Sequence, residues 1–81
     1  MSKLIGISDM SAGDKAVLMG FSTNGGAYRR KLLSMGLTRG VEIEFVKSAP
    51  MGDPVEIRIR GYLLSLRKDE AEVLQLQEVS E

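Results

Sequence analysis

The feature that most constrains the fold is a pair of alternating segments separated by a bend. In residues 41–45, VEIEF, and in residues 55–60, VEIRIR, apolar side chains occupy every second position and charged side chains occupy the others. A period of two places the apolar residues on one face of a β-strand and the charged residues on the other. The two segments therefore predict an antiparallel hairpin with one buried face and one solvent-exposed face.

The charges of the two segments favour one particular register. When the apolar residues of the two strands face one another, each glutamate of the first strand also meets an arginine of the second. The expected cross-strand pairs are Phe45 with Ile57, Ile43 with Ile59, Glu44 with Arg58, and Glu42 with Arg60. Because the apolar and the charged pairs support the same register independently, we expect the hairpin to form in it.

The bend between these segments, residues 48–54, contains both prolines of the chain. Pro50 and Pro54 lack a backbone N–H, so neither can lie within a central strand, while Gly52 and Asp53 are typical turn residues. Met51 is expected to project from the tip, where a flexible apolar side chain suits a protein contact better than solvent. We expect a stiff structural loop that could also serve recognition, but not catalysis.

Residues 27–36, AYRRKLLSMG, predict the main helix. Its apolar residues recur at helical spacing and form one stripe, with Leu33 beside it: Tyr28, Leu32 and Met35. The basic triplet of residues 29–31 lies mainly off this stripe, either as a solvated face or as a patch for an acidic partner. Gly36 occupies the position of a left-handed C-terminal cap, over which Leu37 can fold back.

Three further strands and a helical turn complete the expected fold. The strands span residues 15–21, 62–66 and 72–77, and the turn spans residues 67–71. With the hairpin and the helix, this makes about five short strands and one short α-helix. A small antiparallel sheet that bends into a barrel accommodates them, so we expect a mainly β chain with a single domain over residues 1–81.

The composition excludes most catalytic chemistry. The 81 residues contain no Cys and no His, which removes disulfides, thiolate metal sites and the usual general base. No phosphate-binding motif is present. Asp69, Glu70 and Glu72 match no calcium-loop spacing, and we expect them to be solvated surface acids. The sequence therefore predicts no enzymatic activity, no cofactor and no metal site.

The charge balance and the lengths of the apolar runs bear on partners and location. Eleven basic and eleven acidic residues cancel, whereas nucleic-acid binders usually carry a basic excess. No apolar run reaches the length of a membrane span, and the first residues are too polar for a signal peptide. We expect a cytoplasmic protein that neither inserts into a membrane nor binds nucleic acid.

Three segments together resemble the FeoA family, small cytosolic proteins that accompany FeoB, the bacterial ferrous iron transporter. They are residues 36–40, GLTRG, residues 49–54, APMGDP, and residues 64–67, LSLR, followed by Glu70 and Ala71. Their order, their spacing and the chain length make the resemblance specific, and it extends from Leu4 to about Val79. Arg39 departs from the pattern, because a proline commonly precedes this glycine. The resemblance implies an SH3-like β-barrel with an inserted helix and a regulatory role without catalytic residues.

The leading hypothesis is an interaction module that binds the cytosolic side of FeoB, part of which resembles a small GTPase, and modulates iron transport. The candidate contact residues come from the helix and the bend: Tyr28, Arg29, Arg30, Leu32, Leu33, Pro50, Met51, Gly52 and Asp53. Two alternatives stay open: a free-standing SH3-like regulatory module related to the C-terminal domain of iron-dependent repressors, and a small-barrel nucleic-acid binder. Self-association through an exposed strand edge or the helix face is open as well.

Overall fold

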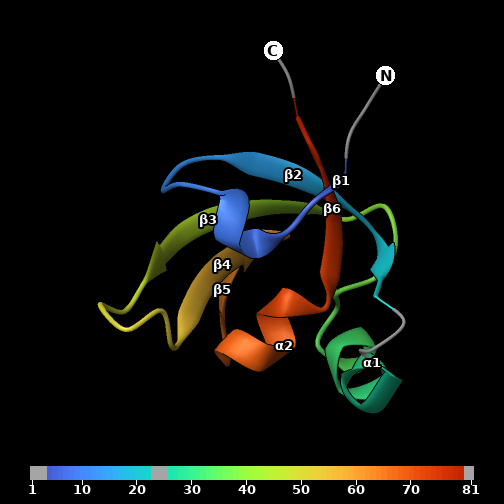
Figure 1. Cartoon of the computed structure of the whole chain (residues 1–81). Coiled ribbons are helices and arrows are strands. Elements are labelled where there is room, and N and C mark those ends of the chain that lie inside the picture. Colours follow the sequence, from blue (N-terminus) through green and yellow to red (C-terminus); the bar gives the residue numbers. More distant parts are fainter. Residues whose placement is uncertain (1–3, 23–25, 80–81) are drawn as a thin grey trace.

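The computed structural model describes residues 4–22 and 26–79, which form a curled antiparallel sheet with short helical segments at its edge (Figure 1). The strands are β1 (Leu4–Ile5), β2 (Lys15–Phe21), β3 (Glu42–Ser48), β4 (Val55–Ile59), β5 (Tyr62–Leu66) and β6 (Leu74–Glu78). The helical segments are the 3-10 turn η1 (Ile7–Asp9) and the α-helices α1 (Gly26–Ser34) and α2 (Lys68–Glu72). The sheet order is β1-β6-β2-β3-β4-β5, with every neighbouring pair antiparallel.

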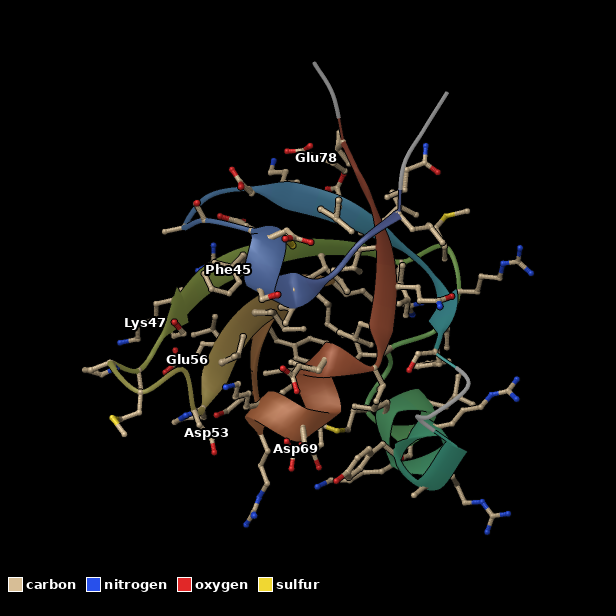
Figure 2. The ribbon with its side chains drawn as sticks, in the orientation of Figure 1. Phe45, Lys47, Asp53, Glu56, Asp69 and Glu78 are labelled. Atoms are coloured by element: carbon tan, nitrogen blue, oxygen red, sulfur yellow. The ribbon has the colours of Figure 1, made fainter. Side chains whose placement is uncertain are left out.

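The predicted hairpin register is confirmed from Ile57 to Ile59 of β4. Ile43 lies opposite Ile59, and Phe45 lies opposite Ile57, with all four side chains buried. On the other face Glu44 lies opposite Arg58, and the Arg58 Nη1 atom is 3.5 Å from the Glu44 Oε1 atom. A bulge between Phe45 and Lys47 then shifts the register, so that Lys47 lies opposite Glu56 (Figure 2).

The predicted pairing of Glu42 with Arg60 is wrong. β4 ends at Ile59, and Arg60 and Gly61 form a two-residue turn to β5 with φ values of +49° and +87°. A tight hairpin of this kind needs positive φ at both turn positions, which takes Arg60 out of the strand. Its Nη2 atom donates a hydrogen bond to Thr38 Oγ1 at 3.3 Å, and Glu42 lies opposite Val17 of β2.

Most element boundaries agree with the sequence, and the structure has six strands where about five were expected. β2 and β5 have the predicted bounds, α1 begins and ends slightly earlier than predicted, and β6 is shifted by a residue or two. The sixth strand is β1, in which Leu4 lies opposite Gln77 and Ile5 opposite Leu76 of β6. A segment of two residues has no periodicity, so only its pairing with a distant strand reveals it.

The core lies inside the curve of the sheet. The largest fully buried side chains come from β2 to β6 and from the end of α1: Leu18, Leu32, Leu37, Ile43, Ile57, Ile59, Leu66, Leu74 and Leu76. η1 covers part of this core with Ile7, and Met10 packs beside it. In the part of the chain that the structure describes, no helix is long and apolar enough to cross a membrane.

Candidate functional site

The structure divides the predicted contact residues into two groups. One group lies on α1, and the other lies on the loop of residues 49–54 between β3 and β4. In Figure 1, α1 and this loop lie on opposite sides of α2. The predicted residues therefore do not form one continuous surface, and each group is described with the elements that surround it.

Only part of the predicted stripe on α1 is accessible. Leu32 is fully buried, and Tyr28 is half-buried against the core. Leu33 is 39% exposed, and the side chains of Arg29 and Arg30 are exposed. The burial of Leu32 makes it a core residue, whereas Leu33 and the two arginines face solvent and are available to a partner.

The C-terminal cap of α1 forms as the sequence predicts. Gly36 has φ +97°, and its N–H donates to the carbonyl oxygen of Leu33 at 3.1 Å. The N–H of Leu37 donates to the carbonyl oxygen of Leu32, also at 3.1 Å, and the Leu37 side chain is fully buried. This pair of hydrogen bonds is a Schellman motif, and it anchors the end of the helix in the core.

A tyrosine of the last strand in the sheet order also fixes the end of α1. The Tyr62 hydroxyl donates to the carbonyl oxygen of Met35 at 3.1 Å. A Cβ atom placed on Gly36 would lie only 2.7 Å from the same hydroxyl oxygen. Gly36 is thus required both by its positive φ and by the close approach of Tyr62, which holds α1 against β5.

An ion pair joins α1 to α2. The Lys31 Nζ atom lies 2.5 Å from the Glu70 Oε2 atom, and the Arg67 N–H donates to the Glu70 Oε1 atom at 3.0 Å. The hydrogen bond from Lys31 and then the one from the Arg67 backbone hold the pKa of Glu70 below its ordinary value, although burial acts in the opposite direction. Glu70 is almost fully buried, so the expectation of a solvated surface acid is wrong for this residue.

A groove lies between the end of β2 and α1. Its volume is about 440 Å³, and its lining is Met19, Gly20, Phe21, Ser22, Gly26, Arg29, Leu33 and Arg39. Two of the predicted contact residues, Arg29 and Leu33, form one wall of it. We call these lining residues the arginine groove.

The rest of the groove is formed by residues outside the predicted partner surface. Met19 and Phe21 lie at the end of β2, which carries none of the predicted contact residues, and both are only half-buried. Arg39 was noted as a departure from the pattern of the turn, yet its side chain faces the groove from the turn after α1. A cation in place of a usual turn proline was the one signal that could have pointed to this site.

The loop of residues 49–54 presents an exposed tip that is tied down behind. Met51 is 85% exposed, as the sequence predicts, and Gly52 has φ +80°. The Gly52 N–H donates to the carbonyl oxygen of Ala49 at 2.7 Å. Asp53 Oδ1 accepts the N–H of Lys68 at 3.1 Å, so the loop is anchored to the first residue of α2.

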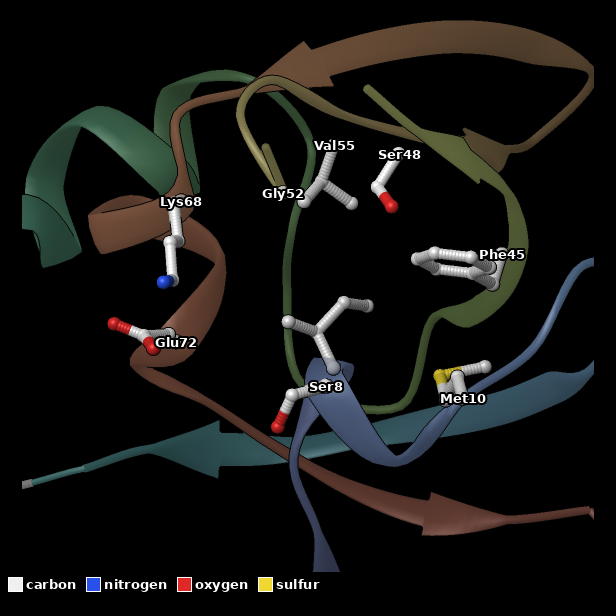
Figure 3. Close-up of a pocket in the computed structure, with 9 residues that line it drawn as sticks. Ser8, Met10, Phe45, Ser48, Gly52, Val55, Lys68 and Glu72 are labelled. Atoms are coloured by element: carbon white, nitrogen blue, oxygen red, sulfur yellow. The ribbon is translucent and has the colours of Figure 1, made fainter. Parts of the chain in front are cut away.

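A small apolar pocket lies beside this loop, between η1, the β3–β4 hairpin and α2 (Figure 3). Its volume is about 220 Å³, and Met10, Phe45 and Val55 line its interior. Lys68 and Glu72 approach it from α2, and Ser8 from η1. The pocket is small and mostly apolar, so it suits a single hydrophobic side chain better than a polar substrate.

The acidic residues do not assemble into a metal centre. Among residues 4–22 and 26–79, no group of three or more His, Cys, Asp or Glu residues is placed to hold a metal ion. Asp69 and Glu72 are exposed on α2, while Glu70 turns inward to Lys31. The arrangement supports contact with another molecule at two surfaces, the arginine groove and the loop.

Comparison with known proteins relates the chain to proteins of ferrous iron transport. A family model described as the FeoA domain matches residues 5–77. A Porphyromonas gingivalis protein described as a fusion of Fe(2+) transport protein A and the Fe(2+) transporter FeoB is 35% identical over 74 residues. That alignment covers 91% of this chain but only 9% of the fusion protein, so the chain spans a small part of that relative.

Solved structures show the same fold. The solution structure of a FeoA-like protein from Clostridium acetobutylicum is 41% identical, with a TM-score of 0.87 over 100% of this chain and 93% of that one. A manganese-dependent transcriptional repressor has a TM-score of 0.85 but is 11% identical, and the match covers 98% of this chain and 44% of that protein. At so low an identity, the likeness to the repressor shows the fold alone.

Proposed function

This chain belongs to the FeoA family of non-catalytic accessory proteins with an SH3-like fold, and on that premise we propose that it regulates bacterial ferrous iron uptake by contact with FeoB. The observation that carries the proposal is the relative in which a FeoA segment and a FeoB transporter are parts of one polypeptide. Covalent linkage keeps two modules at high effective concentration and serves a function where the modules act together. In this protein the corresponding contact with FeoB would form on the cytoplasmic side.

Two surfaces are available for this contact. The exposed side chains of α1, Arg29, Arg30 and Leu33, form the first, and the loop tip around Met51 forms the second. We assign Pro50, Gly52 and Asp53 the task of shaping the tip rather than of binding, because Asp53 already accepts a hydrogen bond from α2. Residues 1–81 would then act as one domain that carries both surfaces.

The test is a binding titration against detergent-solubilised full-length FeoB from the same source, with and without a non-hydrolysable GTP analogue. We expect saturable binding that Arg29→Glu/Arg30→Glu weakens, because the guanidinium groups of these exposed arginines make no ion pair or hydrogen bond with the described residues. Lys15→Glu/Lys47→Glu is the matched control, since it changes the net charge equally at exposed positions of β2 and β3. Absence of binding in both nucleotide states would overturn the proposed function.

A further inference from the structure

We propose that the arginine groove binds a short acidic segment of a partner protein that carries an apolar anchor residue. The inference rests on the proposed function, because it names the partner chemistry for one of the two contact surfaces. It goes beyond α1 itself, since half of the groove is formed by β2 and by Arg39 in the turn before β3.

The charge of the groove determines the charge of its ligand. Arg29 and Arg39 are the charged residues of the lining, and both are cations with exposed side chains. Neither guanidinium has an ion pair or hydrogen bond within residues 4–22 and 26–79. Guanidinium groups that lack a partner among the described residues favour a carboxylate brought by another molecule, which each can bind in bidentate fashion.

Lys31 differs from these arginines because its charge is used to stabilise the fold. It belongs to the same basic triplet as Arg29, but its amine is bound to the buried carboxylate of Glu70. Lys31 therefore holds α1 to α2, while Arg29 lines the groove. The structural role and the recognition role fall on different residues of one helix turn.

The apolar lining determines the second property of the ligand. Met19 and Phe21 are half-buried, and Leu33 is 39% exposed, so these side chains present apolar surface at the same groove. Covering such surface with a partner's Leu or Phe removes apolar area from water and so favours binding. A segment in which acidic residues flank one apolar residue would pair with the arginines and cover the apolar lining at the same time.

The groove is rigidly built on its helical side. The Schellman cap, the hydrogen bond from Tyr62 to Met35 and the Lys31–Glu70 pair all hold α1 in position. A preformed groove does not have to order a helix upon binding, which lowers the entropic cost of association. This makes a short, flexible peptide segment a sufficient ligand.

A nucleic acid is the less suitable anionic ligand. The chain has no net charge, and the groove offers one aromatic ring, that of Phe21, for base stacking. Single-stranded nucleic acids are usually bound by an extended cationic channel with several stacking side chains. The apolar lining is better matched by a hydrophobic side chain than by a sugar–phosphate backbone.

The experiment uses the full chain, labelled with 15N, and a synthetic 12-residue peptide in which Asp and Glu surround a central Leu-Phe pair. We expect the largest amide chemical-shift changes at Gly20, Phe21, Leu33 and Arg39. Little change is expected at Gly52 in the loop or at Lys68 at the start of α2. A control peptide with Asn and Gln in place of the acidic residues should bind at least about tenfold more weakly than the acidic peptide. Arg29→Glu/Arg39→Glu should lose binding to a similar degree, while Lys15→Glu/Lys47→Glu, at exposed positions outside the groove, should stay within about twofold of wild type.

Several outcomes would overturn the inference. It fails if the shifts are absent, if they gather elsewhere, or if the uncharged peptide binds equally well. It also fails if a mixed-sequence single-stranded oligonucleotide binds the groove more tightly than the acidic peptide. Thermal unfolding of both double variants shows beforehand that they are folded.

Titration of the same variants against FeoB separates the two proposals. Peptide binding in the groove without FeoB binding would refute the proposed function but still support the groove as a binding site for an acidic segment. FeoB binding that Arg29→Glu/Arg39→Glu leaves unchanged would refute the groove as the contact and leave the proposed function standing.

Discussion

The arginine groove and the loop of residues 49–54 lie on opposite sides of α2 and differ in how they could bind a partner (Figure 1). The groove offers two guanidinium groups without an ion pair or hydrogen bond in residues 4–22 and 26–79, beside an apolar lining, which suits a ligand of defined charge. The loop offers one exposed methionine beside a small apolar pocket, which suits hydrophobic contact without charge selection. We therefore propose that the groove provides specificity and that the loop adds affinity.

The two surfaces also depend on α2 in different ways. α1 is joined to α2 by the side chains of Lys31 and Glu70, so that tie responds to pH. The loop is joined to α2 by the Asp53 carboxylate and the backbone N–H of Lys68. Substitutions that cut one tie should therefore affect one surface and spare the other.

The largest effect is expected from the core beneath α1. Leu32→Ala removes a fully buried side chain and should lower the free energy of unfolding by about 2–5 kcal/mol. Leu33→Ala, the neighbouring position, should lower it by less than about 1 kcal/mol, because that side chain is 39% exposed. Urea unfolding of both variants measures the difference, and equal stabilities would contradict the described packing of α1.

The next effect concerns the tie between α1 and α2. Lys31→Ala should cost about 1–2 kcal/mol of stability, in the lower part of the range for a charged hydrogen bond, because the Lys31 side chain is 58% exposed. Urea unfolding at neutral pH measures it. A loss of acidic-peptide binding in this variant would show that the tie also positions the groove.

The pH dependence of stability tests the other partner of this tie. The pKa of Glu70 is lowered in the folded state, so its contribution is present above the unfolded carboxyl pKa and is lost as pH falls toward the folded one. The free energy of unfolding, measured from neutral to acidic pH, should therefore fall less steeply for Glu70→Gln than for wild type. Glu72→Gln, at an exposed position of the same helix, is the control and should keep the wild-type slope.

A smaller effect is expected from the tie behind the loop. Asp53→Ala removes the acceptor of the Lys68 N–H and should cost about 0.5–1.5 kcal/mol, because the hydrogen bond is exposed. Asp53→Asn keeps an acceptor and should recover much of this loss. Hydrogen exchange at the Lys68 amide reports the bond directly, and unchanged protection in Asp53→Ala would show that Asp53 does not hold α2.

The smallest effect on stability is expected at the loop tip. Met51→Ser should change the free energy of unfolding by no more than about 0.5 kcal/mol, because the side chain is 85% exposed. FeoB binding should weaken by up to about tenfold, since burying this side chain would contribute apolar area. Unchanged binding would assign the contact to the arginine groove alone.

The local parts of the fold could be predicted because their signals lie within a few residues of each other. The hairpin register follows from alternation and charge in residues 41–45 and 55–60, and the helix cap follows from Gly36 and Leu37. Arg60 was misplaced because two signals conflicted at one residue. The two-residue turn required a positive φ there, and this requirement prevailed over the charge pairing with Glu42.

The candidate site could be predicted only in part, for a different reason. Arg29, Leu33 and Met51 were identified because exposure follows from position on a helix or at a loop tip. Arg39, Met19 and Phe21 were not, because a groove exists only where separate segments meet. Glu70 was taken for a surface acid because its partner, Lys31, lies 39 residues away in the chain.

The sequence by itself determined the family, the strand pairing of the central hairpin and the exclusion of His- and Cys-based chemistry. These depend on residue types and short spacings, which a chain carries before it folds. Folding paired Lys31 of the triplet with Glu70 and placed Arg29 at a groove with Arg39, where neither guanidinium has a partner among the described residues. It also separated the loop from α1, because α2 packs between them and contact between distant segments depends on the whole topology.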